Sequence, residues 1–401
     1  MNTILSLNLD HIDSLINHVK ALAFNRSFSS TGEMKAAQYI KNEMDEKKID
    51  CTIEYFAFTG AKRVFMRLVY VILFTYLIIF RLLLLLLAYF SIKYLIPPAR
   101  NFSLVRKVES RNVVANIKAI KKQDKRSVVI LSAHYDTFSA NIPPGLQKIF
   151  LFLFRIIIIP YILFAIFIAN FFFFTEGPLE ITPLILIFTL IEFAMTTIIF
   201  LLVHDNNHSK GSVDNASGVA ILIELAKLIK VNPFENYDVI FLWSGAEEWG
   251  LKGSKGFCKE HRDYLSKKYD LNRSFNINID MVGSYIGLET NRSLLLRGRK
   301  ALFDLNKRIE ESAEELNIPL TVSDKIFGSK ADHKSFRSFA KKTKSSFQVG
   351  YFHSEKDSKF IHSSKDTPDK CDPGNLNGCL EICYNTIKSI DSMNFSSKEI
   401  R

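Results

Sequence analysis

Two long apolar runs limit what this 401-residue chain can fold into more than any other feature. Residues 149–174 and 184–203 are rich in Phe, Ile and Leu, and each reaches the roughly 20 residues that a membrane-spanning helix requires. The segment 175–183 between them is more polar and contains two prolines. The pattern predicts a transmembrane hairpin, and a buried pair of helices in a soluble domain is the less favoured alternative.

A third apolar run, residues 64–96, is interrupted by Arg67, Arg81 and Lys93 and is followed by two prolines. It is short for two complete spans, so a helical hairpin and a single long helix both stay open. The chain would then have four or three membrane helices. We therefore predict two membrane insertions, at 61–98 and 145–204.

The remaining sequence alternates between short apolar runs typical of buried strands and amphipathic runs typical of helices. Strands are expected at 112–117, 127–132, 237–242, 275–280, 293–297 and 345–349. Helices are expected at 8–24, 31–48, 215–230, 251–269, 300–316 and 375–392. This alternation predicts an α/β domain, which is discontinuous and comprises 1–60, 99–144 and 205–401.

The charge of the chain favours a membrane over nucleic acid as a partner. Lys and Arg number 52 against 41 Asp and Glu, which gives a net charge of +11. The lysines are dispersed and no nucleic-acid-binding motif accompanies them, so we expect contact with a lipid bilayer and none with nucleic acid. The five cysteines form no CxxC pair, which indicates a reducing compartment.

Charge also predicts the side of the membrane on which the α/β domain lies. Basic residues flank the apolar runs on the domain side, whereas the loop 175–183 carries Glu176 and Glu180. The N-terminal residues lack the apolar core of a signal peptide. These features predict an integral, multi-pass membrane protein whose α/β domain lies on the cytoplasmic side.

An adjacent acidic pair, Glu247 and Glu248, follows the expected strand 237–242. The carboxyl end of a strand is where open α/β sheets bind their ligands. Two neighbouring carboxylates there can have separate roles, because one can bind a cation while the other transfers a proton. Taken alone, the pair is more simply explained as a solvated acidic turn.

Four other segments place ligand-type side chains at comparable positions. His134 and Asp136 follow the strand 127–132, and Asp280 ends the strand 275–280. Asp214 precedes the helix 215–230, where an N-cap is the ordinary explanation, and His362 lies in a polar loop. Each residue has an ordinary structural explanation by itself.

Together these segments predict a metal site. Two histidines and three carboxylates suit a pair of divalent ions with coordination positions left open for water. The candidate ligands are His134, Asp214, Glu248, Asp280 and His362. Glu247 remains as a general base that accepts a proton from a metal-activated water.

Five short motifs carry these residues, namely AHYD at 133–136, VDNASGVA at 213–220, WSGAEEWGL at 243–251, NIDMVG at 278–283 and HSSKDT at 362–367. In this order they resemble the M28 family of zinc peptidases, an aminopeptidase group with co-catalytic zinc. The resemblance covers the soluble residues from about 110 to 393, with a fainter match at 26–39. It implies a three-layer α/β sandwich around a central mixed, mostly parallel sheet, into which the transmembrane helices are inserted.

The resemblance also implies a role for each residue. Asp214 would bridge two Zn²⁺ ions, with His134 and Asp280 completing one site and Glu248 and His362 the other. The general base would be Glu247, and Asp136 would orient the imidazole of the first histidine.

Two features of the family pattern stay open. The oxyanion-stabilising tyrosine of some relatives has no clear counterpart here, and Tyr351 and His353 are only candidates. Asp332 and His333 resemble a family Asp-His segment, without an assigned role.

The function that these observations predict is a membrane-bound, two-zinc exopeptidase, most simply an aminopeptidase that hydrolyses peptides. Carboxypeptidase and dipeptidase activities stay open, as does the oligomeric state. A glutaminyl-cyclase-like acyltransferase with one zinc is an alternative, but the bridging segment 214–218 argues against it. A non-catalytic membrane scaffold is a further alternative, disfavoured because no candidate ligand is missing.

Overall fold

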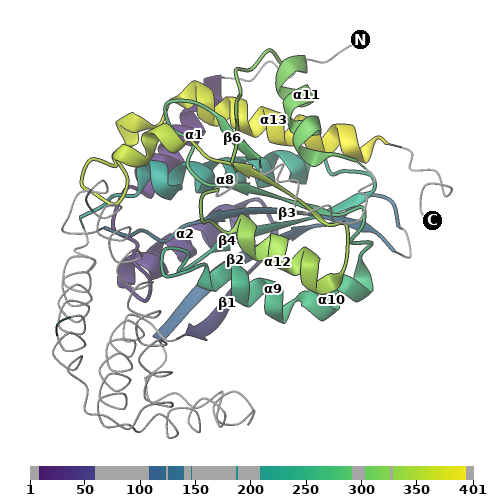
Figure 1. Ribbon diagram of the computed structural model, residues 1–401, viewed down its shortest axis with the longest axis horizontal. Coiled ribbons are helices and arrows are strands. Elements are labelled where there is room, and N and C mark those ends of the chain that lie inside the picture. Colours follow the sequence, from purple (N-terminus) through teal and green to yellow (C-terminus); the bar gives the residue numbers. More distant parts are fainter. Residues whose placement is uncertain are drawn as a thin grey trace, which may run out of the picture. The chain divides into compact units, whose positions relative to one another are not determined.

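The computed structural model describes residues 9–58, 108–122, 125–139, 208–290, 303–325 and 328–393, together with Leu146 and Ile187. The chain divides into two compact units: Met1–Ala57, Glu109–Ser139 and Asn207–Arg401 form one, and Phe58–Val108 and Ala140–Asn206 form the other. The helices and strands labelled in Figure 1 lie in the first unit, apart from one residue at the end of each of two strands. The domain boundaries expected from the sequence stay a prediction.

Within the described ranges, the first unit is built on a sheet of eight strands in the order β1-β2-β4-β3-β5-β8-β6-β7. Neighbours β3–β4, β3–β5, β5–β8 and β6–β7 are parallel, whereas β2–β4 and β6–β8 are antiparallel. The strands are β1 (Asp50–Phe58), β2 (Val108–Ile117), β3 (Ser127–His134), β4 (Tyr237–Ser244), β5 (Phe275–Ile279), β6 (Gly287–Thr290), β7 (Thr321–Asp324) and β8 (Gln348–Phe352). The mixed sheet expected from the sequence is confirmed.

The register of the central strands brings their carboxyl ends to one edge of the sheet. Strands β3 and β4 are buried along their whole length, which explains why they are almost continuously apolar. His134 at the end of β3 is level with Ser244 at the end of β4. Ile279 at the end of β5 is level with Phe352 at the end of β8. This edge is where parallel sheets bind ligands.

Helices cover both faces of the sheet (Figure 1). One face carries α1 (Leu9–Ala21), α2 (Thr31–Glu46), α8 (Ser217–Val231), α11 (Leu305–Glu315) and α13 (Pro373–Asp391), and the other carries α9 (Lys252–Glu260), α10 (Arg262–Lys268) and α12 (His333–Thr343). Successive residues of β4 point into opposite cores, since Trp243 packs with the first group and Leu242 with the second. The predicted α/β fold with helices on both faces of a mixed sheet is confirmed.

The localisation predicted from the sequence requires a correction. A helix that crosses a bilayer needs about 20 apolar residues. In the part of the chain that the structure describes, no helix is long and apolar enough to do so, and the longest, α13, has 19 residues and includes Lys388 and Asp391. The prediction of an integral, multi-pass membrane protein with a cytoplasmic α/β domain is therefore contradicted. The insertions predicted at 61–98 and 145–204 lie outside the described residues, apart from Leu146 and Ile187.

Candidate metal centre

The candidate ligands lie in loops at the carboxyl-end edge of the sheet. His134 is the last residue of β3, and Asp280 directly follows β5. The loop after β4 carries Glu247 and Glu248, while Asp214 lies in the tight turn Ser212–Ala216 before α8. Strand direction thus delivers side chains that are far apart in the sequence to one place.

A first group consists of His134, Asp214 and Asp280, all buried, with ligand atoms that lie within 4.8 Å of one another. The Nε2 atom of His134 is 2.9 Å from Asp214 Oδ1 and 3.3 Å from Asp280 Oδ1. One imidazole nitrogen and two carboxylate oxygens therefore converge on a single point.

A second group shares one member with the first, and consists of Asp214, Glu248 and His362. The Nε2 atom of His362 is 3.0 Å from Glu248 Oε1 and 3.4 Å from Asp214 Oδ2. Asp214 therefore turns Oδ1 toward one group and Oδ2 toward the other. The two groups therefore share the carboxylate of Asp214 through different oxygens.

The chemistry of the donors fits zinc. Each group offers three protein ligands, a histidine nitrogen and two carboxylate oxygens, which is the number typical of catalytic zinc sites with an open position. Imidazole and carboxylate donors also suit other divalent transition metals, but a soft-metal site would need thiolates. The cysteines are all buried and belong to neither group.

Asp136 connects the first histidine with the acidic loop. The backbone N–H groups of Glu247 and Glu248 donate to its carboxylate, at 2.9 Å and 3.2 Å. Its carbonyl oxygen lies 3.2 Å from Nδ1 of His134, which leaves Nε2 directed at the first group. Asp136 thus contacts the acidic loop through its carboxylate and a candidate ligand through its backbone carbonyl oxygen.

Hydrogen bonds from side chains stabilise the turn that carries Asp214, whose backbone is not helical. The Asp214–Asn215 peptide bond is cis, and both residues have non-helical backbone angles. Asp366 accepts hydrogen bonds from the backbone N–H groups of Val213 and Asp214, at 2.6 Å and 3.2 Å. The side chain of Asn215 donates to Ile279 O at 2.9 Å, so the turn is fastened to the end of β5.

Burial and neighbouring charge set the ionisation of the acids. Burial opposes ionisation of Asp214, but hydrogen bonds and charges from His134 and His362 outweigh it and hold its pKa below the ordinary range. Burial raises the pKa of Glu247 well above the ordinary value, and the Glu248 carboxylate adds to this against the opposing charge of His134.

The two residues left open as oxyanion candidates lie beside Asp280. The Tyr351 hydroxyl donates to Asp280 Oδ2 at 3.2 Å, and Nδ1 of His353 is 3.2 Å from Asp280 O. Tyr351 is fully buried, with its ring stacked on those of His333 and His353 at centroid distances of 3.9 Å and 5.4 Å. Tyr351 therefore holds the carboxylate of Asp280, a candidate ligand, through a hydrogen bond from its hydroxyl.

The Asp-His segment, Asp332 and His333, contacts the end of β4, where the acidic loop begins. Asp332 is buried, accepts a hydrogen bond from the hydroxyl of Ser244, and has a pKa that burial raises to about 6. His333 is fully buried, and burial lowers its pKa well below the ordinary value. Neither belongs to the two ligand groups.

One aromatic ring packs against the second group and belongs to a cluster of three rings. Phe138 packs edge-on against the His362 ring, with centroids 5.2 Å apart. Trp249, the residue after Glu248, contacts Phe138 at 6.2 Å and Phe28 at 4.8 Å. These rings give the ligands an apolar side, which strengthens electrostatic interactions there.

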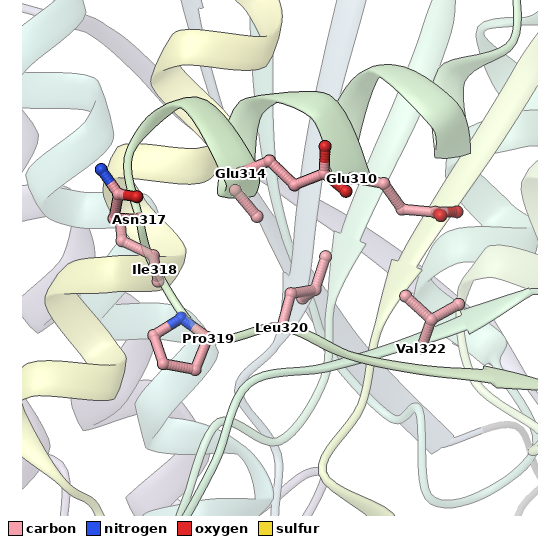
Figure 2. A pocket seen from close by; sticks show the side chains of 8 residues that line it. Glu310, Glu314, Asn317, Ile318, Pro319, Leu320 and Val322 are labelled. Atoms are coloured by element: carbon pink, nitrogen blue, oxygen red, sulfur yellow. The ribbon is translucent and has the colours of Figure 1, made fainter.

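A groove of about 540 Å³ lies between α11 and the segment that leads into β7, as Figure 2 shows. It is lined by Glu310, Ala313, Glu314, Asn317, Ile318, Pro319, Leu320 and Val322. No candidate ligand lines it, so the groove is separate from the metal centre. The convergence of ligand atoms, rather than this hollow, identifies the candidate functional site.

Comparison with known proteins agrees with this geometry. The model of peptidase family M28 matches residues 196–387, a range that includes Asp214, the acidic pair, Asp280 and His362. Aminopeptidase YwaD of Bacillus subtilis is 42% identical over 77 residues, which are 19% of this chain and 16% of that protein. The match thus spans less than a fifth of that relative's length.

Solved structures extend the likeness to almost the whole chain. An aminopeptidase from Aneurinibacillus sp. strain AM-1 superposes with a TM-score of 0.56 at 14% identity, covering 94% of this chain and 93% of that one. The chain has an M28 aminopeptidase-like fold. A glutaminyl cyclase from an Acidobacteriales bacterium superposes with a TM-score of 0.54 at 15% identity, covering 95% and 94%. Aminopeptidases and glutaminyl cyclases thus both share this fold.

The sequence did not point to three residues that hold the site, Arg26, Asn215 and Asp366. Each lies inside a segment that carries the family resemblance, but nothing in the sequence distinguishes it from its neighbours there. Their contacts are with backbone groups, and such contacts leave no periodic pattern in the sequence.

Proposed function

We propose that this protein is a zinc metallopeptidase that binds two zinc ions and removes amino acids from the amino terminus of peptides. The observation that carries the proposal is Asp214, whose two carboxylate oxygens face two separate histidine–carboxylate groups. The match to peptidase family M28 and the aminopeptidase-like fold support the same conclusion.

We assign His134 and Asp280 to one zinc ion, Glu248 and His362 to the other, and Asp214 to both. When bound, the two ions would polarise the scissile carbonyl group and lower the pKa of a water molecule. Tyr351 keeps Asp280 in place through its hydroxyl.

Glu247 is the proton carrier in this proposal. Among the residues that the structure describes, its carboxylate forms no hydrogen bond, while its backbone N–H is fixed on Asp136. The carboxylate is therefore free to accept a proton from the attacking water and to deliver it to the leaving amine. The aromatic side formed by Phe138 and Trp249 limits access of bulk water to this step.

The test is hydrolysis of a peptide series by purified protein, with the zinc content measured in parallel. Release of the first amino acid is expected from peptides with a free amino terminus and not from acetylated ones. Glu247→Gln is expected to lower kcat by about 10²–10⁴-fold while zinc stays bound. Glu46→Gln, at an exposed position on α2, is the matched control. Full activity of Glu247→Gln contradicts the mechanism, and hydrolysis of acetylated peptides contradicts the aminopeptidase assignment.

A glutaminyl-cyclase-like acyltransferase is the second candidate, because a glutaminyl cyclase shares the fold to a similar degree. The shared carboxylate of Asp214 favours two zinc ions over one. One zinc ion per protein, together with cyclisation of peptides that begin with glutamine, would favour the cyclase. Absence of both zinc and turnover would instead favour a non-catalytic scaffold.

A further inference from the structure

Arg26, in the link between α1 and α2, is a fully buried cation that contacts two distant segments of the chain. Its guanidinium donates to Tyr135 O at 2.7 Å, to Lys210 O at 2.9 Å and to Gly211 O at 2.8 Å. It also donates to two carbonyl oxygens of its own segment, those of Leu22 and Phe24.

The backbone of Arg26 strengthens one of these connections. Its N–H donates to the Thr137 hydroxyl at 2.8 Å, and the Thr137 N–H donates to Arg26 O at 3.4 Å. The Ser139 hydroxyl in turn accepts from the His208 N–H at 2.9 Å. The segments around residues 137 and 210 are therefore tied to Arg26 and to each other.

These two segments are the ends of the long insertion between the first two ligands. The chain leaves the first compact unit after Ser139 and returns at Asn207. His134 directly precedes Tyr135, and Asp214 follows Gly211 in the same turn region. The hydrogen bonds of Arg26 thus lie within a few residues of both ligands.

The charge and shape of arginine suit this position. Burial lowers the pKa of Arg26 to about 10, while the nearby carboxylates of Asp366, Asp136 and Asp214 oppose that change, so the side chain stays charged at neutral pH. The hydrogen bonds that the guanidinium donates to described residues all end on backbone carbonyl oxygens. The guanidinium of arginine is planar and carries N–H groups on three nitrogen atoms, so it can donate to carbonyl oxygens on several sides. The ammonium of lysine carries its three N–H groups on one nitrogen and cannot reach all of these oxygens.

We propose that Arg26 is a positioning residue that fastens both ends of the insertion to the α1–α2 link and thereby keeps His134 and Asp214 at ligand distance. The inference rests on the proposed function in one respect, because it takes these two residues to be zinc ligands. Anchoring of the two insertion ends is independent of the metal.

The first test is amide hydrogen exchange of the full-length, metal-free protein. Arg26→Lys is expected to raise exchange at least tenfold in peptides that cover 135–139 and 208–214, with no change in β5. Arg126→Lys is the matched control, since Arg126 lies at the opposite end of β3, where it bonds to Asp238 at 2.9 Å. Arg26→Met, which removes the charge, is expected to have a larger effect in the same two segments.

Unchanged exchange in both segments overturns the proposal. Faster exchange throughout the protein, including β5, also overturns it, because Arg26 would then contribute only to general stability.

The second test measures zinc affinity by competition with a chromophoric chelator. Arg26→Lys is expected to bind the first zinc at least tenfold more weakly than wild type, and Arg126→Lys within twofold of it. Equal affinity of Arg26→Lys and wild type, with loosened segments, overturns the positioning role. A wild-type protein that binds no zinc contradicts the proposed function, and the exchange comparison then decides by itself whether Arg26 fastens the insertion.

Discussion

Replacement of Glu224 by Gln should destabilise the protein in a pH-dependent way. Glu224 lies on α8 and is buried against α1. Its Oε1 atom accepts from Ser14 at 2.9 Å and from Lys227 at 3.0 Å, and lies 2.8 Å from His18 Nε2. The charged carboxylate is the centre of a polar cluster that joins the two helices.

The expected magnitude follows from the ionisation of this group. Burial opposes the charge, but the hydrogen bond to His18 and the charge of Lys227 outweigh it and lower the pKa of Glu224 from 4.5 to about 2. A tenfold change in proton affinity corresponds to about 1.4 kcal/mol, so the lowering corresponds to about 3 kcal/mol. Because the folded-state pKa is the lower one, this stability is present above pH 4.5 and is lost as the pH falls through about 2.

Urea unfolding at pH 7 and pH 3 tests this reasoning. Glu224→Gln should lower the free energy of unfolding by about 2–3 kcal/mol at pH 7 and by about half as much at pH 3. Glu46→Gln, which removes an exposed carboxylate from α2, should change it by less than about 0.5 kcal/mol at either pH. A Glu224→Gln effect that is equally large at both pH values would refute the electrostatic explanation, since cavity or packing effects do not titrate.

Three further predictions concern the candidate metal centre. Tyr351→Phe removes the hydroxyl that holds a proposed ligand and should weaken zinc binding about tenfold, measured by chelator competition. Gly218→Ala should lower the free energy of unfolding by about 1–3 kcal/mol in urea, although alanine favours helices, because its Cβ would lie 2.6 Å from Asn215 Oδ1. Zinc binding at pH 7 should release protons, because neighbouring carboxylates outweigh burial and raise the pKa of His134 and His362; calorimetry in two buffers measures the release, and binding without proton release contradicts this prediction.

The central strands could be predicted closely from the sequence because burial on both faces leaves an unbroken apolar run. The expected strand 127–132 extends two residues further, to His134, and the expected strand 237–242 extends to Ser244. Each extension consists of one apolar core residue, Ala133 or Trp243, followed by a polar residue, His134 or Ser244, at the edge of the sheet. The apolar run therefore underestimates the length of the strand where the strand reaches the candidate site.

Shorter and peripheral elements could not be predicted in the same way. Strand β1 lies at the edge of the sheet, where exposed and buried positions mix, and β7 has only four residues, mostly exposed. The helix expected at 251–269 is in fact two helices, α9 and α10, separated at His261. The side chain of His261 bonds to Glu54 in β1, a contact that helical periodicity does not reveal.

The hydrogen bonds of the acids in the centre separate the proposed ligands from the residues that hold the backbone in place. Asp136 and Asp366 each accept two backbone N–H groups, so their carboxylate oxygens are occupied by amide donors rather than directed at the two ligand groups. Asp214 and Glu248 instead face imidazole rings with their side-chain oxygens.

A buried group of carboxylates that outnumbers its cationic partners can lower its free energy by binding protons or by binding metal ions. The first response is evident in Glu247 and Asp366, because burial raises the pKa of Glu247 well above its ordinary value and that of Asp366 to about 7. Arg26 offsets part of the excess charge, but its hydrogen bonds are committed to backbone carbonyls. Under the proposed function, divalent cations bound by the two histidine–carboxylate groups would neutralise the acids that lack amide donors.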